Sequence, residues 1–493
     1  MLEVSQQLHR DLPPTRVWGY GGMYPGPTIE AWRGQPLSVK FTNELPDRHL
    51  FHDAIDHTLE GSGADMPEVR TVVHLHGGRT LPESDGHPNA WFTRNFAETG
   101  AFFSGQTNYY SNDQPPCMLW YHDHAMGITR LNVVAGLAGL YIIREPGEQS
   151  LGLPRGRYEV PLVIQDRTFL PDGSILYPTQ GLVPDVHPQW TPDYFGDVAL
   201  VNGKVRPYLE VEPRKYRFRI VLGANATFYN LKLSSGQNFI QIGTELGFLP
   251  SPVSMPEILL SPAERADVIV DFAGHDGEDI LLENDAVRPY PIGLFGPGPS
   301  PIMQFRVRRR SSGSDESRIP AELPAAPPLE ESAAVLTRDV MLSEETVMAG
   351  PLHLPTRLLV EGLPFSAPVI TTPAAGSTEI WRFINVSAVA HPMHIHLAHM
   401  QVLDRQFFDF DRYMQTQEIV PVSPPLPPAP NEVNAPKDTV RVDLASITRV
   451  LVKFDLPIGT PMTSGQRFQY VHHCHMLEHE DNDMMRPFDI VAP

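Results

Sequence analysis

The sequence predicts an all-β protein built from three consecutive β-sandwich or barrel domains. The chain has 493 residues, which is too long for one ordinary domain and suits about three. It contains 51 prolines, roughly twice the usual share, and proline avoids helix interiors and central strands. Short runs of β-forming residues recur between Pro, Gly, Asn and Asp, which is typical of sandwiches and barrels.

The strands that these runs predict are spread over the whole chain. The clearest are, in order, Pro36–Thr42, Thr71–Leu75, Leu137–Ile143, Tyr216–Leu222, Asp267–Phe272, Val440–Val442 and Arg449–Phe454. No long segment has a strong helical period, so we expect few helices.

Proline-rich stretches mark the connections. Arg308–Glu331 is predicted to separate the second and third domains, and Val420–Pro436 is predicted to be a long surface loop inside the third. A further joint falls near Glu145–Arg157. We therefore predict domains at residues 1–146, 157–308 and 332–493.

The charge balance restricts the partners. Lys and Arg number 38 against 58 Asp and Glu, giving a net charge of -20 without a basic cluster. Nucleic acid and an anionic membrane are therefore excluded as expected partners. The longest apolar stretch, Val133–Ile143, is far too short to span a membrane. We expect a monomer.

The compartment is left open by the sequence. The first residues have neither the basic nor the apolar region of a signal peptide. The protein is therefore expected in the cytoplasm or at a spore or cell surface, unless a signal has been removed. The two cysteines, Cys117 and Cys474, give no indication of an oxidising compartment.

Four His-X-His pairs are the strongest functional signal. Because side chains at i and i+2 of a strand share a face, each pair offers two imidazoles on one side. Eight imidazoles exceed what one mononuclear metal site uses. The pairs are His74-Leu75-His76, His122-Asp123-His124, His394-Ile395-His396 and His473-Cys474-His475.

The distribution of the pairs predicts a contact between domains. Two pairs lie in the first domain and two in the third, whereas the middle domain has only the isolated His187 and His275. One cluster can gather all four pairs only if the first domain packs against the third. The middle domain is then expected to be a scaffold without metal.

The fourth pair indicates a second, mononuclear centre. If Tyr470–Met476 is a strand, His473 and His475 face one side and Cys474 faces the other. Cys474 can then bind a metal together with His391, His479 and Met484. Two His, one Cys and a weak axial Met make a blue-copper electron-transfer site. Spacing favours Met484 over Met485 as the axial ligand.

An electron-transfer site next to a multi-histidine cluster suggests that electrons are passed to the cluster. If the cluster reduced O₂ to water, it would also need protons, and two carboxylates are candidates for delivering them. Asp85 lies nine residues after His76, and Glu480 directly follows His479. For both residues, an ordinary surface or supporting role is the alternative. Asp123 lies between two histidines but is expected to face away from them.

Extended motifs carry a family resemblance. They are His74-Leu-His76-Gly77-Gly78, Trp120-Tyr-His122-Asp-His124-Ala125-Met126, His391-Pro-Met-His394-Ile-His396, Tyr470–Pro487, and, in the middle domain, Val201-Asn-Gly-Lys-Val205 and Glu212-Pro-Arg-Lys-Tyr-Arg217. Together they resemble the multicopper oxidases, and most closely the bacterial spore-coat-type laccases. The resemblance implies three cupredoxin-like Greek-key domains, with a trinuclear copper cluster between the first and the third.

The resemblance also implies four coppers per chain and a ligand for each position. One type 1 copper would use His391, Cys474, His479 and Met484. One type 2 copper would use His74 and His394. Of the two type 3 coppers, one would use His76, His122 and His475, and the other His124, His396 and His473. Asp85 and Glu480 occupy positions that assist proton delivery in the family.

The expected activity is that of a laccase. A phenol or aromatic amine would dock beside His479, whose ring edge should reach the surface. An electron would pass through Cys474, His473 and His475 to the cluster, where O₂ becomes water. His472, Val389-Ala390 and the Pro424–Pro436 loop depart from the family pattern, which leaves the donor open.

Other functions stay as alternatives. Bilirubin oxidase and cuprous-ion oxidase activity would use the same copper set, although the 16 methionines form no cluster along the chain. A structural coat protein with copper sites is a further possibility. Copper nitrite reductase would not need four His-X-His pairs.

Overall fold

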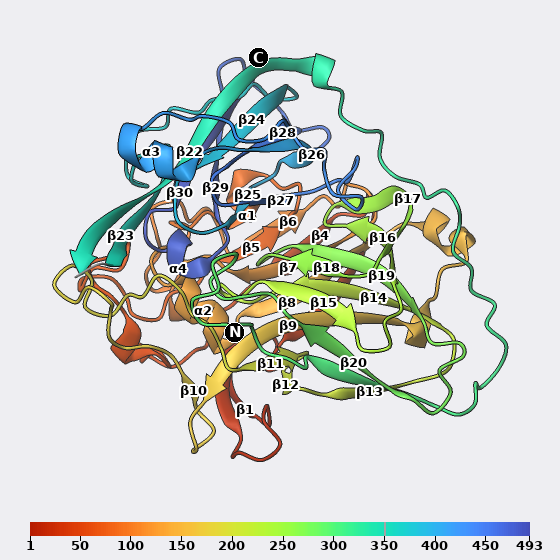
Figure 1. Ribbon diagram of the computed structural model, residues 1–493. Coiled ribbons are helices and arrows are strands. Elements are labelled where there is room, and N and C mark those ends of the chain that lie inside the picture. Colours follow the sequence, from red (N-terminus) through yellow and green to blue (C-terminus); the bar gives the residue numbers. More distant parts are fainter. Residues whose placement is uncertain (350–351) are drawn as a thin grey trace.

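The computed structural model describes residues 1–349 and 352–493 and is dominated by strands, which hold 41% of the chain. The α-helices of the described residues are all short: α1 (Pro82–Asp85), α2 (Thr129–Ala135), α3 (Phe410–Thr416) and α4 (Leu477–Glu480). Short 3₁₀ turns lie at His52–Ala54, Arg94–Phe96, Pro146–Leu151, Gly156–Tyr158 and Glu331–Ala333. The prediction of an all-β fold is confirmed (Figure 1).

The first third of the chain forms one four-stranded sheet and two strand pairs. The sheet has the order β3-β8-β7-β5, and the pairs are β1-β2 and β4-β6. Their bounds are β1 (Leu2–Gln6), β2 (Thr15–Gly19), β3 (Gly26–Trp32), β4 (Leu37–Lys40), β5 (Val73–His76), β6 (Thr107–Tyr110), β7 (Cys117–Asp123) and β8 (Ala138–Arg144). Both β5 and β7 are buried along their whole length, which fits their apolar and histidine side chains.

The middle third forms two sheets around its own apolar core. The larger has the order β12-β11-β9-β14-β19-β16-β17 with β10 beside β9, and the smaller has the order β13-β21-β20-β15-β18. Their bounds are β9 (Glu159–Phe169), β10 (Ile175–Leu176), β11 (Val198–Val201), β12 (Lys204–Val205), β13 (Tyr208–Val211), β14 (Lys215–Leu222), β15 (Tyr229–Leu233), β16 (Phe239–Thr244), β17 (Gly247–Met255), β18 (Ile258–Leu260), β19 (Arg265–Asp271), β20 (Asp279–Asn284) and β21 (Met303–Val307).

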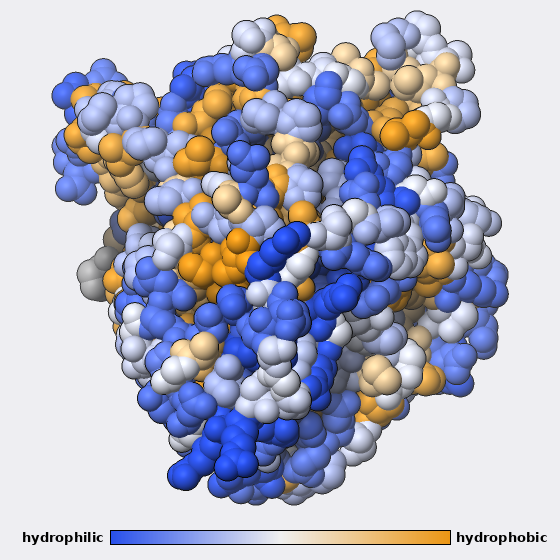
Figure 2. Space-filling view, turned by 90° about the vertical axis from the view of Figure 1, so that its right-hand side faces the viewer, coloured by the Kyte–Doolittle hydropathy of each residue, from blue (hydrophilic) through white to orange (hydrophobic). Residues whose placement is uncertain are grey.

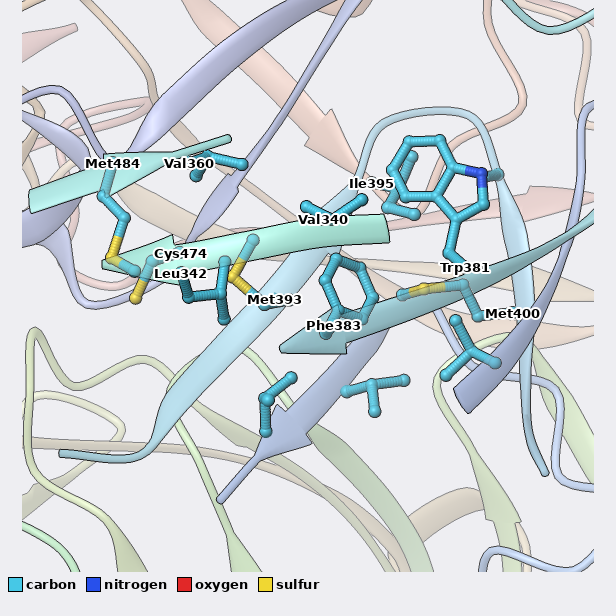
Figure 3. Packing of buried hydrophobic residues seen from close by; sticks show 14 of the residues in the cluster. Val340, Leu342, Val360, Trp381, Phe383, Met393, Ile395, Met400, Cys474 and Met484 are labelled. Carbon is cyan, nitrogen blue, oxygen red and sulfur yellow. The ribbon is translucent and has the colours of Figure 1, made fainter. Parts of the chain in front are cut away.

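The last third also forms two sheets, with the orders β23-β22-β24-β28-β26 and β27-β25-β29-β30. Figure 3 shows their packing: Trp381 and Phe383 of one sheet meet Met393 and Ile395 of the other. The bounds are β22 (Ala334–Ala349), β23 (Leu352–Val360), β24 (Thr378–Asn385), β25 (His391–Ile395), β26 (His399–Phe407), β27 (Thr439–Val442), β28 (Ser446–Lys453), β29 (Arg467–Cys474) and β30 (Met485–Val491).

Each sheet takes its strands from one third of the chain only. The domain limits at 146, 157, 308 and 332 stay predictions, although 308–331 does run as an irregular connection along the outside of the molecule (Figure 1). Every strand expected from the sequence overlaps an observed one. The differences lie at the strand ends; β29, for example, ends at Cys474 rather than Met476.

The surface mixes polar and apolar groups. The face shown in Figure 2 is mostly hydrophilic, with scattered apolar side chains, as on most folded proteins. Within residues 1–349 and 352–493, no helix combines the length and apolar character that a membrane span requires.

The last part of the proline-rich loop at 420–436 is held against the protein by a buried ion pair. Glu432 forms a two-fold ion pair with Arg405 of β26, at 2.6 and 2.7 Å, and both side chains are about nine-tenths buried. Burial acts to raise the pKa of Glu432, but the Arg405 guanidinium outweighs it and lowers that pKa to about 2. The pair therefore fixes the loop that leads into β27.

Replacing Glu432 with Gln should destabilise the protein by about 3 kcal/mol at neutral pH, the lower end for a broken buried pair. The buried Arg405 would lose its two-fold partner and keep the more distant Asp443 carboxylate, 3.8 Å from its Nε. Since the folded-state pKa of Glu432 is depressed, its stabilisation is present above its ordinary pKa near 4.3 and disappears as the pH falls toward 2. Chemical denaturation of both proteins across this range measures the difference, which should shrink on acidification.

The exposed pair Arg10–Asp11 provides the control for this measurement. Asp11→Asn should change stability by no more than about 0.5 kcal/mol. A Glu432→Gln protein as stable as the Asp11→Asn protein would contradict the prediction.

Candidate metal centres

Two strand pairings align the four His-X-His pairs. In the first third, β5 and β7 run antiparallel with His74 opposite His122. In the last third, β25 and β29 run antiparallel with His394 opposite His473. His124, His396 and His475 follow directly after the ends of these strands. Pairing register therefore turns four separate motifs into two compact sets of imidazoles.

The two sets meet face to face in the interior. His74 stacks on His396 and His76 stacks on His394, each with ring centroids 3.7 Å apart. All eight imidazoles are fully buried. The first and last thirds of the chain thus pack against each other at the histidines, as a single cluster requires.

Within the cluster, the side chains form groups whose ligand atoms lie within 4.8 Å of one another. The groups are His74 with His76 and His394, His76 with His122 and His475, and His124 with His396 and His473. Sequence reasoning singled out each of these residues.

The hydrogen bonds of the rings show why a cation fits between them. His74 Nδ1 lies 2.5 Å from the Asp85 carbonyl, and His394 Nδ1 lies 2.7 Å from the Asp438 carbonyl. A carbonyl only accepts, so each Nδ1 carries the proton and each Nε2 carries a lone pair. These two Nε2 atoms nevertheless face each other at 3.4 Å. A positive ion between them satisfies both lone pairs.

The same pattern recurs in the other groups. His122 Nδ1 bonds to the Asp123 carbonyl, which leaves its Nε2 as a lone pair 3.4 Å from His475 Nε2. His473 Nε2 lies 3.3 Å from His124 Nε2 and 3.2 Å from His396 Nε2. Burial, reinforced by neighbouring imidazoles, holds the pKa of His74, His122 and His396 well below the ordinary value, so these rings are neutral, as metal binding requires.

A second centre lies on the opposite face of β29. Cys474 Sγ lies 3.4 Å from His391 Nδ1 and 3.6 Å from His479 Nδ1, and the two nitrogens are 3.3 Å apart. The other nitrogen of His391 contacts Ser387 Oγ at 2.5 Å, which leaves Nδ1 free to face the thiol. A thiolate with two imidazoles is the equatorial donor set of a blue-copper site.

Met484 lies beside this centre, whereas Met485 does not. Met484 is buried in the same apolar cluster as Cys474, and the two side chains lie near each other (Figure 3). The Met484 carbonyl also accepts a 3.0 Å hydrogen bond from the Cys474 amide. Met485 packs in a separate cluster with Met126, Phe365 and Val471. The position of Met484 suits an axial ligand, and Met485 is part of the apolar packing.

The expectation that the ring edge of His479 reaches the surface is wrong. Only 2% of its side chain is exposed, because a segment of the middle third covers it. Asp193 Oδ1 lies 3.7 Å from His479 Nε2, and the Trp190 indole donates to the Glu478 carbonyl at 2.9 Å. The middle third therefore does more than act as a spacer: it closes the mononuclear centre.

The two predicted carboxylates both contact the histidine cluster. Asp85 Oδ2 lies 2.6 Å from His396 Nδ1, and Glu480 Oε2 lies 3.1 Å from His473 Nδ1. Burial raises the pKa of Asp85 and of Glu480 to about 8 each. Asp123 faces away from the cluster, as expected: it accepts hydrogen bonds from the amides of Val72 and Ala125.

Asp193 and Asp438 contact the two centres, and Arg265 contacts Asp438, but none of the three carries a signal that sequence reasoning detected. Asp193 and Arg265 belong to the middle third, far along the chain from every histidine motif. Asp438 sits at the start of β27, and only the pairing of β27 with β25 brings it to the histidines. Strand periodicity alone does not reveal such contacts.

Comparison with known proteins also indicates a copper protein. Multicopper oxidase family models match residues 4–56 and 346–492. A laccase of Bacillus subtilis is 45% identical over 100% of this chain and 94% of its own length. A multicopper oxidase of Arabidopsis thaliana is 40% identical over 100% of this chain and 88% of its own length.

Solved structures share the fold. The McoA multicopper oxidase of Aquifex aeolicus superposes with a TM-score of 0.75 at 27% identity, covering 100% of this chain and 96% of that one. A laccase of Pediococcus acidilactici gives a TM-score of 0.71 at 26% identity, covering 99% and 89%. The expected architecture of cupredoxin-like domains is thereby confirmed. With full-length relatives at 45% identity and donor sets suited to copper, this chain belongs to the multicopper oxidases.

Proposed function

We propose that this protein is a laccase-type oxidase, which oxidises small aromatic donors one electron at a time and reduces O₂ to water. One observation carries the proposal: Cys474 of the mononuclear centre lies between His473 and His475 of the trinuclear cluster. Bound copper supplies the one-electron redox chemistry and the binding of O₂. The chain provides a covalent connection between the two centres that is only one residue long.

We assign the ligands by the groups described above. His391, Cys474, His479 and Met484 would hold type 1 copper, and His74 and His394 would hold type 2 copper. His76, His122 and His475 would hold one type 3 copper, and His124, His396 and His473 the other. Four coppers per chain then use every buried lone pair of the cluster.

The surrounding residues orient the ligands and supply protons. The carbonyls of Asp85, Asp123 and Asp438 each fix the tautomer of one histidine, so that no reorganisation is needed when a metal binds. We propose Asp85 and Glu480 for proton delivery, because their carboxylates touch ligand histidines from two sides of the cluster. Their complete burial excludes bulk water from this region.

The donor is proposed to approach His479 along Asp193. The Asp193 side chain is 14% exposed and can accept from a phenol O–H or an aromatic amine N–H. Its Oδ1, which faces His479, is buried and has no hydrogen-bond partner among the described residues. Cuprous-ion oxidase activity would use the same copper set, but Asp193 gives it no special support: Cu(I) prefers soft sulfur ligands, and burial raises the pKa of Asp193 to about 8. Bilirubin oxidase activity would use the same copper set with a bulkier donor.

Oxygen uptake by copper-saturated protein distinguishes these functions. An electron-rich phenol, Cu(I) and bilirubin are compared as donors, and peroxide is assayed. Uptake that is fastest with the phenol and yields no peroxide is the expected result. Uptake dominated by Cu(I) would instead make metal oxidation the function. If none of the donors supported oxygen uptake, a copper-binding coat protein would be the remaining function.

Replacing Cys474 with Ser should abolish the blue colour and reduce turnover to background, because a hydroxyl does not replace the thiolate ligand. Copper analysis should show one copper fewer per chain. Cys117→Ser is the matched control, since Cys117 is the other buried cysteine and lies outside both centres. A Cys474→Ser protein that stays blue would overturn the assignment.

Replacing Met484 with Leu should raise the reduction potential of the mononuclear centre, because a non-coordinating side chain removes the weak axial ligand. A redox titration followed by the blue absorbance measures this. Met485→Leu, which changes the neighbouring methionine in the separate cluster, should leave the potential unchanged. Equal potentials in both variants would count against Met484 as a ligand.

A further inference from the structure

Arg265 is a buried residue of the middle third that contacts all three parts of the chain. It lies at the start of β19, and its side chain is 1% exposed. Its Nε donates to the Met118 carbonyl of β7 at 3.1 Å, and one Nη donates to the Ala263 carbonyl at 3.0 Å. Both Nη atoms donate to the Asp438 carboxylate, one of them at 2.7 Å to Oδ1.

Asp438 in turn holds two histidines of the trinuclear cluster. Its carboxylate Oδ1 lies 3.1 Å from His76 Nε2, and its backbone carbonyl lies 2.7 Å from His394 Nδ1. Thr439 assists, because its hydroxyl donates to Asp438 Oδ1 at 2.9 Å while Oγ1 lies 3.1 Å from His76 Nε2. One residue therefore orients one histidine through its side chain and another through its backbone.

The contact decides which nitrogen of His76 is available to a metal. With Asp438 and Thr439 accepting at Nε2, the proton stays on Nε2 and the lone pair stays on Nδ1. Nδ1 is buried and has no hydrogen-bond partner in the part of the chain that the structure describes. His76 thus differs from His74, His122 and His394, whose Nδ1 atoms donate to carbonyls and whose Nε2 atoms face the cluster.

The chain leaves space for this contact at Gly77. Gly77 has φ +81°, and a Cβ at this position would lie 2.2 Å from Asp438 Oδ2 and 2.7 Å from the Nη2 atom of Arg265. A side chain here would push the ion pair away from His76. The glycine directly after the first His-X-His pair is therefore required by the Arg265–Asp438 pair as well as by its backbone conformation.

A second set of charges anchors Asp438 to the middle third. Lys437, its neighbour, bonds to Glu245 and Glu264 at 3.0 Å, and Glu245 also accepts from the Arg265 amide at 3.1 Å. The Pro436 carbonyl accepts from the Leu246 amide at 3.0 Å. The segment that carries Asp438 is thereby held by the middle third from several sides.

We propose that Arg265 is a positioning residue of the trinuclear cluster, which acts through Asp438 to present Nδ1 of His76 to a type 3 copper. The proposal rests on the copper assignment made above. The middle third then contributes to the oxygen-reducing centre without supplying a ligand. Loss of such a supporting contact typically costs 10–100-fold in metal affinity.

Two variants test the proposal. Arg265→Lys keeps the charge but not the two-fold bond to Asp438, and Asp438→Asn removes the charge that fixes the His76 proton. The control is Arg167→Lys, because Arg167 is an equally buried arginine of the middle third whose side chain bonds only to the Val133, Val134 and Asp166 carbonyls. Thermal denaturation of the copper-free proteins checks that all three variants fold.

Copper binding, rather than turnover alone, gives the readout. Arg265→Lys and Asp438→Asn should bind copper at the trinuclear cluster about 10–100-fold more weakly and should lose the near-ultraviolet band of the coupled type 3 pair. The blue absorbance of the mononuclear centre should persist in both variants. Arg167→Lys should keep both signals.

Three results would overturn the proposal or its basis, and they differ from one another. Unchanged copper content and type 3 absorbance in Arg265→Lys and Asp438→Asn would show that the contact does not position His76. An equal loss of copper affinity and type 3 absorbance in Arg167→Lys would show that the effect comes from general packing between the parts of the chain. A wild-type protein that itself binds no coupled copper pair would instead remove the proposed function.

Discussion

The structure depends on the burial of eight neutral imidazoles, seven of which turn Nε2 toward the Nε2 of another ring. Such an arrangement is unfavourable by itself, since buried acceptors without donors lose their hydrogen bonds to water. Metal binding turns this cost into affinity, because the rings are already deprotonated and oriented. The strand registers, the contact between the first and last thirds, and the carbonyls that fix the tautomers all serve this one arrangement.

The sequence predicted what depends on local periodicity. Two-residue alternation places His473 and His475 on one face and Cys474 on the other, and this holds even though β29 ends at Cys474. The same rule identified all four pairs. Spacing within a ten-residue segment also selected Met484 over Met485, which the two separate apolar clusters now explain.

Features that arise from packing between distant segments escaped prediction. His479 was expected to reach the surface because the electron donor is expected to dock beside it. The cover comes from Trp190 and Asp193, almost 300 residues earlier in the chain. Likewise, Arg265 reaches the histidine cluster only because β19 lies against β7 and the start of β27. The motifs therefore predicted the histidines and the cysteine that the structure brings together, but not the residues that enclose and orient them.

The cover over His479 comes from a different part of the chain than the proposed ligands. The choice of electron donor and the copper chemistry can therefore change separately. The proposed ligands all belong to the first and last thirds of the chain: most lie on strands or directly after them, His479 lies in α4, and Met484 directly precedes β30. Asp193, whose side chain faces His479, instead belongs to an irregular segment of the middle third. Variation in that segment can alter which molecules approach His479 while every proposed ligand stays unchanged. Within such a scaffold, donor range can diversify while oxygen chemistry is conserved, and a library confined to residues 187–196 can explore this range.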